Sequence, residues 1–171
     1  QVLIGDVDGD GAADLVFVDD GRITLWINQS GNGWSDPIEI DGTPRFTNED
    51  DVRLVDLLGT GVSGILWSLR PLANQRDRGF FLDFTNGVKP YLLARMNNHR
   101  GAITEVHYRS STEEFLRDQE RPETRWKTTL PLPVQVVSKV VVHDEFSGGR
   151  LTTDYRYHHG YWDGGEREYR A

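Results

Sequence analysis

Hydrophobic residues along the chain occur in short runs separated by turn-forming residues. The runs are rich in Val, Ile and aromatic residues, and Gly, Asn, Asp or Pro stands between them. No window sustains hydrophobic residues at helical spacing, although Thr112–Arg121 is compatible with one short helix. The pattern therefore predicts an all-β fold. The clearest predicted strands are Leu15–Val18, Ile23–Ile27, Ile65–Leu69, Ile103–Tyr108, Val134–Val142 and Leu151–Tyr157.

Part of this pattern is repeated. Residues 6–17 resemble residues 56–67 at a constant offset of 50, with matching first aspartates, two matching glycines and a matching apolar-apolar-aromatic end. A loop of this kind followed by short strands is typical of β-propeller blades, and two copies cannot close a ring. We therefore expect a partial β-propeller of two blades, with further blades outside this sequence.

The first copy is rich in carboxylates at a regular spacing, D-x-D-x-D-G-x-x-D. Alternate aspartates can turn inward around a cation, and the glycine allows the chain to bend sharply. Oxygen ligands in this number favour Ca²⁺ over zinc, copper or Mg²⁺. We predict a structural calcium ion that holds the loop in shape. The predicted ligands are Asp6, Asp8, Asp10, Asp14 and the carbonyl of Ala12.

Two other kinds of loop share features with this one, an EF-hand and a solvated acidic turn. An EF-hand needs a bidentate Glu at its twelfth position, where this chain has Phe17, and it needs a helix where the pattern predicts a strand. The EF-hand is therefore excluded, whereas a solvated acidic turn without metal stays open. In the second copy the last three aspartates have become Leu58, Thr60 and Gly64, so we expect no metal there.

The charge of the chain is unevenly distributed. The formal net charge is −8, and residues 1–72 carry 13 acidic and 4 basic residues. A bound divalent cation would offset part of this excess, and the acidic balance argues against a nucleic-acid partner. The segment Arg70–Arg78 is polar and poor in strand formers, so we predict a first region at 1–72 and a second at 73–171.

Composition excludes several further classes. Without cysteine there are no disulfides and no thiolate zinc sites, and no apolar run is long enough to span a bilayer. The chain begins at Gln1 and contains one methionine, so we expect it to be a piece of a longer protein.

No group of residues predicts catalysis. His158 and His159 are adjacent, and neighbouring strand residues point to opposite faces. Ser110-Ser111 lacks a nucleophile-elbow context. Glu166 and Glu168 are interleaved with arginines, which indicates surface ion pairs rather than a pair of catalytic acids.

Residues 5–18 resemble the FG-GAP/VCBS calcium repeat of integrin-type β-propellers. Further motifs, taken in order, resemble the B component of the bacterial Tc (toxin complex) insecticidal toxins and the related region of the SpvB virulence protein. These motifs are Lys89–Leu93, Asn97-Asn98, Gly101, Tyr108–Ser111, Trp126, Leu130–Val137 and Tyr155–Arg170.

This resemblance implies a secreted, non-enzymatic protein without direct membrane insertion. The B component of the family carries a β-propeller that docks onto a pore-forming A component. Its Rhs/YD-type strands contribute to a shell that the C component completes around a toxic enzyme. Residues 1–72 would be FG-GAP-like blades, and residues 73–171 would begin the shell.

The sequence is also compatible with two alternative functions. One is a calcium-dependent extracellular adhesion or carbohydrate-binding propeller. The other is a carbohydrate-active enzyme on a propeller, which requires a pair of carboxylates across a pocket, a geometry that a sequence does not reveal.

Overall fold

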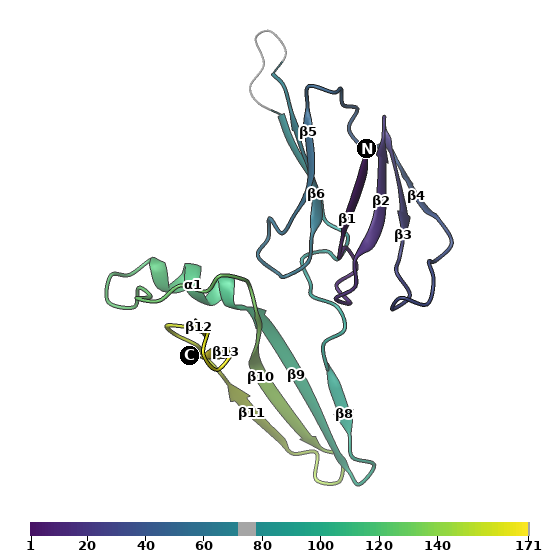
Figure 1. The fold of residues 1–171 in the computed structure, drawn as a ribbon. Helices are drawn as coiled ribbons and strands as arrows, with labels where there is room; N and C mark the ends of the chain where they lie inside the picture. The colour runs from purple at the N-terminus through teal and green to yellow at the C-terminus, as the bar shows by residue number, and fades with distance from the viewer. Residues whose placement is uncertain (72–77, 171) are drawn as a thin grey trace. The chain divides into compact units, whose positions relative to one another are not determined.

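The computed structural model describes residues 1–71 and 78–170, and consists of antiparallel strands with one helix (Figure 1). The all-β prediction is therefore confirmed. The chain divides into two compact units. The first contains residues 1–58 and 62–91, and the second contains residues 59–61 and the chain from residue 92 onward. No helix in the described part of the chain is both long and apolar enough to cross a membrane.

The first unit opens with a four-stranded meander in the order β1-β2-β3-β4. Its central strands alternate in burial, because successive side chains of a strand point to opposite faces. Val16 and Val18 on β2 and Ile23 and Leu25 on β3 are buried, and all four belong to one face. The strands are β1 (Val2–Gly5), β2 (Asp14–Asp19), β3 (Arg22–Trp26) and β4 (Ile38–Asp41).

A second meander in the same unit has three strands, in the order β5-β6-β7. These strands are β5 (Asp51–Val55), β6 (Gly64–Leu69) and β7 (Arg78–Leu82). β6 starts and ends 50 residues after β2, so the sequence repeat corresponds to a structural repeat. Ile65, Trp67 and Leu69 on β6 are buried.

The two meanders share one hydrophobic core. Trp67, which is 1% exposed, is its largest side chain, and burial of apolar area of this kind is the main favourable contribution to folding. The buried residues of this core are Val7, Val16, Val18, Ile23, Leu25, Val52, Ile65, Trp67 and Leu69.

The second unit contains a four-stranded antiparallel sheet, a helix and a hairpin. The sheet has the order β11-β10-β9-β8, with β8 (Arg95–Asn97), β9 (Ala102–Ser110), β10 (Gln135–Asp144) and β11 (Arg150–Asp154). The hairpin pairs β12 (Tyr161–Asp163) with β13 (Glu168–Arg170).

The predicted short helix is confirmed as α1 (Ser111–Gln119), which follows β9 directly. Ser110 is its N-cap and accepts a hydrogen bond from the backbone N–H of Thr112. Glu113 and Glu114 lie in the first turn and Arg117 in the last, which is the charge order that a helix dipole favours.

The boundary between the units differs from the predicted one. Most of the segment in which it was predicted, residues 72–77, lies outside the described residues. β7 follows that segment and pairs with β6 over Arg78–Leu82, which keeps it in the first unit. The first unit therefore extends to Tyr91 instead of ending at residue 72.

Gly64 provides a test of the second meander. A Cβ at this position would overlap the carbonyl oxygen of Leu82 and the ring of Phe81. We expect Gly64→Ala to lower the free energy of unfolding by about 1–3 kcal/mol, the usual cost of overpacking. Gly79→Ala is the matched control, since a Cβ there meets no atom within 4 Å. Equal midpoints of chemical denaturation for the two variants would contradict this packing.

Candidate functional site

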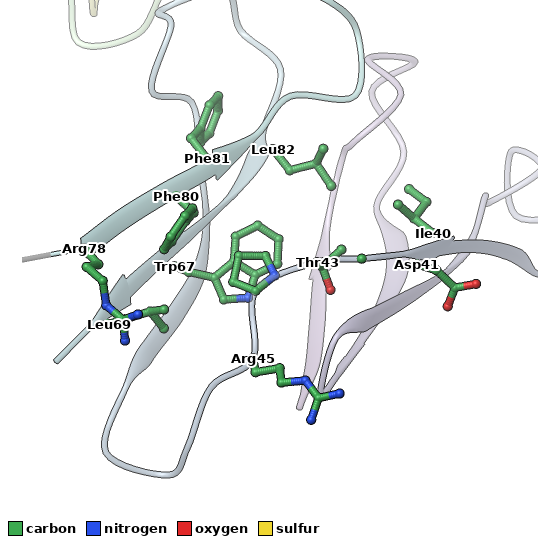
Figure 2. A pocket seen from close by; sticks show the side chains of 12 residues that line it. Ile40, Asp41, Thr43, Arg45, Trp67, Leu69, Arg78, Phe80, Phe81 and Leu82 are labelled. Carbon is green, nitrogen blue, oxygen red and sulfur yellow. The ribbon is translucent and has the colours of Figure 1, made fainter. Parts of the chain in front are cut away.

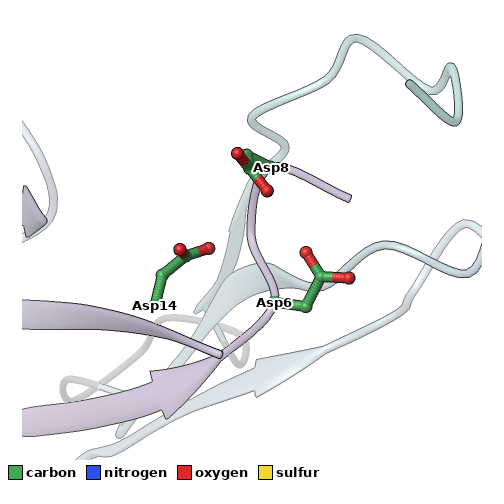
Figure 3. Close-up of side chains that lie close together, drawn as sticks. All are labelled: Asp6, Asp8 and Asp14. Atoms are coloured by element: carbon green, nitrogen blue, oxygen red, sulfur yellow. The ribbon is translucent and has the colours of Figure 1, made fainter. Parts of the chain in front are cut away.

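The aspartate loop between β1 and β2 gathers three of its four carboxylates. Asp6, Asp8 and Asp14 each present an oxygen, and these oxygens lie within 4.8 Å of one another (Figure 3). Figure 3 shows the three side chains converging from successive parts of the loop. Of the predicted carboxylates, the structure thus brings together two of the alternating aspartates, Asp6 and Asp8, with Asp14 at the start of β2.

Hydrogen bonds from the carboxylates to backbone N–H groups fold the loop. Asp6 accepts from Gly9 at 2.6 Å through Oδ1 and from Gly11 at 3.0 Å through Oδ2. Both glycines have positive φ values, 84° and 92°, which other residues rarely adopt. Asp8 Oδ1 accepts from the N–H of Asp10 at 3.0 Å. The same side chains thus shape the loop and supply its negative charge.

Asp14 is completely buried at the start of β2. Its two oxygens accept hydrogen bonds from the backbone N–H groups of Val7 and Asn28, each at 2.9 Å. A buried carboxylate requires such donors, because it loses its hydration on folding. Asp14 therefore links the aspartate loop to the chain that leaves β3.

The two remaining predicted ligands are placed differently. Asp10 is exposed and lies outside the cluster of three carboxylates. Its Oδ1 accepts a hydrogen bond from the N–H of Ala12 at 2.7 Å, so in this conformation the pair forms a local turn. The structure therefore gathers Asp6, Asp8 and Asp14, but not Asp10.

Two residues at the loop were not found as site residues from the sequence. Lys89 Nζ lies 4.0 Å from Asp6 Oδ2, and the Tyr91 hydroxyl donates to Asp8 Oδ2 at 3.2 Å. The charge of Asp8 and this hydrogen bond raise the pKa of Tyr91 above its usual value. Both residues lie some 80 positions after the aspartate loop in the sequence, so the spacing within the loop does not reveal them. In the sequence they were noted only as part of the motif Lys89–Leu93.

This donor set fits a hard divalent cation. All three converging groups are carboxylates, and one nearby ammonium offsets only part of their charge. Oxygen donors of this kind are the ligands that Ca²⁺ prefers. Phe17, at the position where an EF-hand needs its glutamate, lies in strand β2, which confirms that the loop is not an EF-hand.

The second copy of the loop has different contacts. Its tip, residues 59–61, belongs to the second unit, where the Ser110 hydroxyl donates to the carbonyl of Gly59. Gln135 Nε2 donates to the carbonyl of Thr60 at 2.9 Å. Protein donors thus bind the backbone of this tip.

A second group of buried charges lies on α1. Glu114 and Asp118 are one helical turn apart and are 1% and 3% exposed. Glu114 Oε1 accepts from Arg109 Nη1 at 2.8 Å, and its Oε2 lies 2.5 Å from Arg117 Nη1. Burial raises the pKa of Glu114, but the hydrogen bonds from these two arginines outweigh it, and the net pKa is lowered.

Asp118 is held by three different side chains. Its Oδ2 accepts from Trp126 Nε1 at 2.8 Å and lies 2.6 Å from His158 Nδ1, while Oδ1 accepts from Arg117 at 2.9 Å. Burial opposes ionisation, but the donors of Trp126, Arg117 and His158 together lower the pKa of Asp118 to about 2. The carboxylate is thus ionised and fully engaged in structural bonds.

The other candidates from the sequence have separate partners. His158 bonds to Asp118, whereas His159 Nδ1 accepts from the N–H of Lys127 at 3.3 Å, so the two histidines do not face one site. Ser111 Oγ accepts from the N–H of Val134. Arg170 pairs with Glu168 at 2.7 Å, which confirms a surface ion pair at that position.

The chain resembles proteins of one family along almost its whole length. The sequence model of a family described as "Insecticide toxin TcdB middle/N-terminal region" matches residues 28–171. Comparison with curated protein sequences gives no match.

Solved structures of toxin-complex proteins match the chain along almost its whole length. A TcdB2-TccC3 crystal structure without its hypervariable C-terminal region is 34% identical over 99% of this chain, with a TM-score of 0.82. The TcdB2-TccC3-Cdc42 structure is also 34% identical, with a TM-score of 0.81. A Photorhabdus luminescens Tc holotoxin pore structure is 33% identical over 99% of the chain, with a TM-score of 0.83. The chain spans 8% of the length of each of these matched chains.

The low pKa of Asp118 predicts a specific acid sensitivity. A carboxyl with a folded pKa of about 2 and an ordinary value of 3.8 stabilises the fold above about pH 4, and this contribution is lost as pH falls towards 2. The shift corresponds to about 2 kcal/mol. We expect the stability difference between wild type and Asp118→Asn, measured by urea denaturation, to shrink over this interval.

Asp154→Asn is the control, because Asp154 is exposed and lies 3.6 Å from Lys139. Its stability difference from wild type is expected to stay small at every pH. A constant difference for Asp118→Asn between pH 5 and pH 2 would contradict the role assigned to this carboxylate.

Proposed function

Because the chain belongs to the insecticide toxin TcdB middle/N-terminal region family, we propose that it is a non-catalytic structural segment of the B component of a secreted toxin complex. The observation that carries this proposal is the similarity to the TcdB2-TccC3 chains over 99% of the sequence, across both units. A homologue at 34% identity with this coverage supports the same place in the parent protein.

We assign different roles to the two units. The first unit would form the last two blades of a β-propeller that docks onto a pore-forming A component. Two successive meanders with a shared core and a repeat of 50 residues support this assignment. The second unit, with its long paired strands β9 and β10, would begin the Rhs-type shell that a C component completes.

We also propose that the aspartate loop binds a structural calcium ion. Asp6, Asp8 and Asp14 would be the principal ligands, with Asp10 and the carbonyl of Ala12 completing the set after a local rearrangement. The ion would neutralise the charge that these carboxylates place beside the start of β2. It would hold the loop in shape and would take no part in a reaction.

The absence of an enzymatic role is supported by how the buried ionisable groups are used. Glu114 and Asp118 have their oxygens bonded to arginine, tryptophan or histidine donors. Each thus has a structural partner already, and neither is available as a free acid or base.

The calcium proposal predicts a change in thermal stability. At calcium concentrations 100-fold above the dissociation constant, which we expect to be micromolar or weaker, the unfolding midpoint should rise on the order of 5–10 °C. Asp8→Asn should abolish the rise. Asp10→Asn should reduce it less, because Asp10 lies outside the cluster. Differential scanning calorimetry with calcium and with chelator measures both effects.

Asp36→Asn is the matched control, since Asp36 is exposed and outside the loop. It should retain the full calcium response. A wild-type midpoint that is the same in calcium and in chelator would leave the acidic turn without metal as the better interpretation.

The division of roles predicts which unit each partner covers. Hydrogen exchange on the complete polypeptide should slow in first-unit loops, including that around the half-exposed Trp34, when a pore-forming component binds. It should slow in the second unit when the shell-completing component is added. Each unit is the control for the other partner. If either partner slowed hydrogen exchange to the same extent in both units, the assignment would be contradicted.

A further inference from the structure

Strand β7 is paired on one side only within the described residues. The first meander of the unit has four strands, whereas the second ends at β7, which pairs with β6. Alternate backbone N–H and C=O groups of an edge strand point away from its neighbour and remain open to another strand. β7 is therefore an edge at the position where the first meander continues into β4.

No strand in the described part of the chain completes this edge. After β3 the chain returns as β4 and pairs with β3 over Arg22–Leu25. After β7 the next strand is β8, which pairs with β9 in the second unit instead. The second meander thus repeats the first without its fourth strand.

A pocket of about 580 Å³ lies beside the open edge (Figure 2). β7 contributes Phe80, and β6 contributes Trp67, which pairs with it in register. The opposite wall comes from the end of β4 and the loop that follows it, including Thr43 and Arg45. Phe80 is 44% exposed, so part of a large apolar ring is open to solvent beside this edge.

Three polar atoms in this pocket are buried and have no hydrogen-bond partner among the described residues. They are Trp67 Nε1, Arg78 Nε and Thr43 Oγ1. Buried polar groups are nearly always bonded, because leaving one unpaired costs free energy. Two of the three can only donate, so the missing group is an acceptor of hydrogen bonds.

The charges of the pocket indicate which acceptor fits. Asp41 is bonded to Arg22 at 2.6 Å, and Arg45 lies 3.6 Å from Asp20. Arg78 forms no ion pair within the described residues, although its Nε is buried. A carboxylate would satisfy both the charge and the donor of this arginine.

We propose that β7 receives an extended segment of the same polypeptide, from outside residues 1–171, as a fourth strand that places an acidic side chain against Arg78. Every second side chain of such a strand would lie on the same face as Arg78 and Phe80. An acidic residue would meet the unpaired donors, and an apolar one two positions away would cover Phe80.

A segment of the same polypeptide is favoured over a second copy. The chain spans 8% of the matched TcdB2-TccC3 chain, so most of such a polypeptide is tethered to this unit. Tethering raises the effective concentration of the segment far above that of a separate molecule. The inference rests on the proposed place of the chain in a longer polypeptide, but not on calcium or on docking to a partner.

Photo-crosslinking of the complete polypeptide tests this inference. A benzoylphenylalanine in place of Phe80 should crosslink to one segment outside residues 1–171 that contains Asp or Glu, identified by mass spectrometry. Mixing isotopically light and heavy protein separates crosslinks within one molecule from those between copies. Crosslinks to a second copy, to another toxin component or only to residues 72–77 would overturn the proposal, as would none.

The matched control is the same probe at Phe17. This residue is 38% exposed and lies on β2, which is paired on both sides by β1 and β3. It should not crosslink to the segment captured at position 80. Slow hydrogen exchange of β7 amides is expected in the same sample, and fast exchange of all of them would also overturn the proposal.

A charge reversal tests the acidic residue. Arg78→Glu should lower the crosslink yield at position 80 at least about fivefold, because like charges would then face each other. Arg53→Glu is the control, since Arg53 lies on β5, does not line the pocket, has a 63% exposed side chain and should change the yield little. An unchanged yield in Arg78→Glu, with a native near-UV spectrum, would overturn the acidic contact. An intact crosslink with failed assembly would instead contradict the proposed function alone.

Discussion

The buried carboxylate of Asp14 is the interaction on which the first unit depends. It brings together the start of β2, the loop at Val7 and the chain at Asn28 through two backbone hydrogen bonds. A buried carboxylate is unfavourable unless donors surround it, and here the donors come from two separate segments, at Val7 and at Asn28. Asp14 thereby fixes the path of the loop, and the remaining carboxylates, Asp6 and Asp8, are placed within reach of it.

In the second meander, the start of the equivalent strand β6 is held without a buried carboxylate. Gly64 occupies the position equivalent to Asp14, and the ring of Phe81 and the carbonyl of Leu82 fill the space that a side chain there would require. The tip of that loop is bound by Ser110 and Gln135. The first copy thus concentrates negative charge, while the second keeps one aspartate, Asp56, and relies on packing at Gly64 and on neutral hydrogen bonds at its tip.

Sequence patterns predicted the features that depend on local order. The strand around Val16, the helix at Ser111 and the convergence of Asp6 and Asp8 all follow from spacing over a few residues. Contacts between distant segments were not accessible in this way: Tyr91 reaches Asp8 across 83 positions, and Trp126 and His158 meet at Asp118. The extent of the first compact unit was inaccessible for the same reason, because pairing of β7 with β6 is a property of the sheet and not of the polar segment between them.

The two units differ in how fully the buried polar groups discussed above are hydrogen-bonded. In the second unit, Glu114 and Asp118 are buried, yet arginine, tryptophan and histidine donors satisfy them. In the first unit, the donors of Trp67 and Arg78 are buried and have no partner among residues 1–71 and 78–170, and they lie beside a strand edge that is also unpaired within those residues. Unpaired donors and an open edge at the same place indicate a common missing neighbour, because one added strand would satisfy both. The proposed strand would thus do at β7 what Val7 and Asn28 do at Asp14, because it would supply the missing partners of buried polar groups.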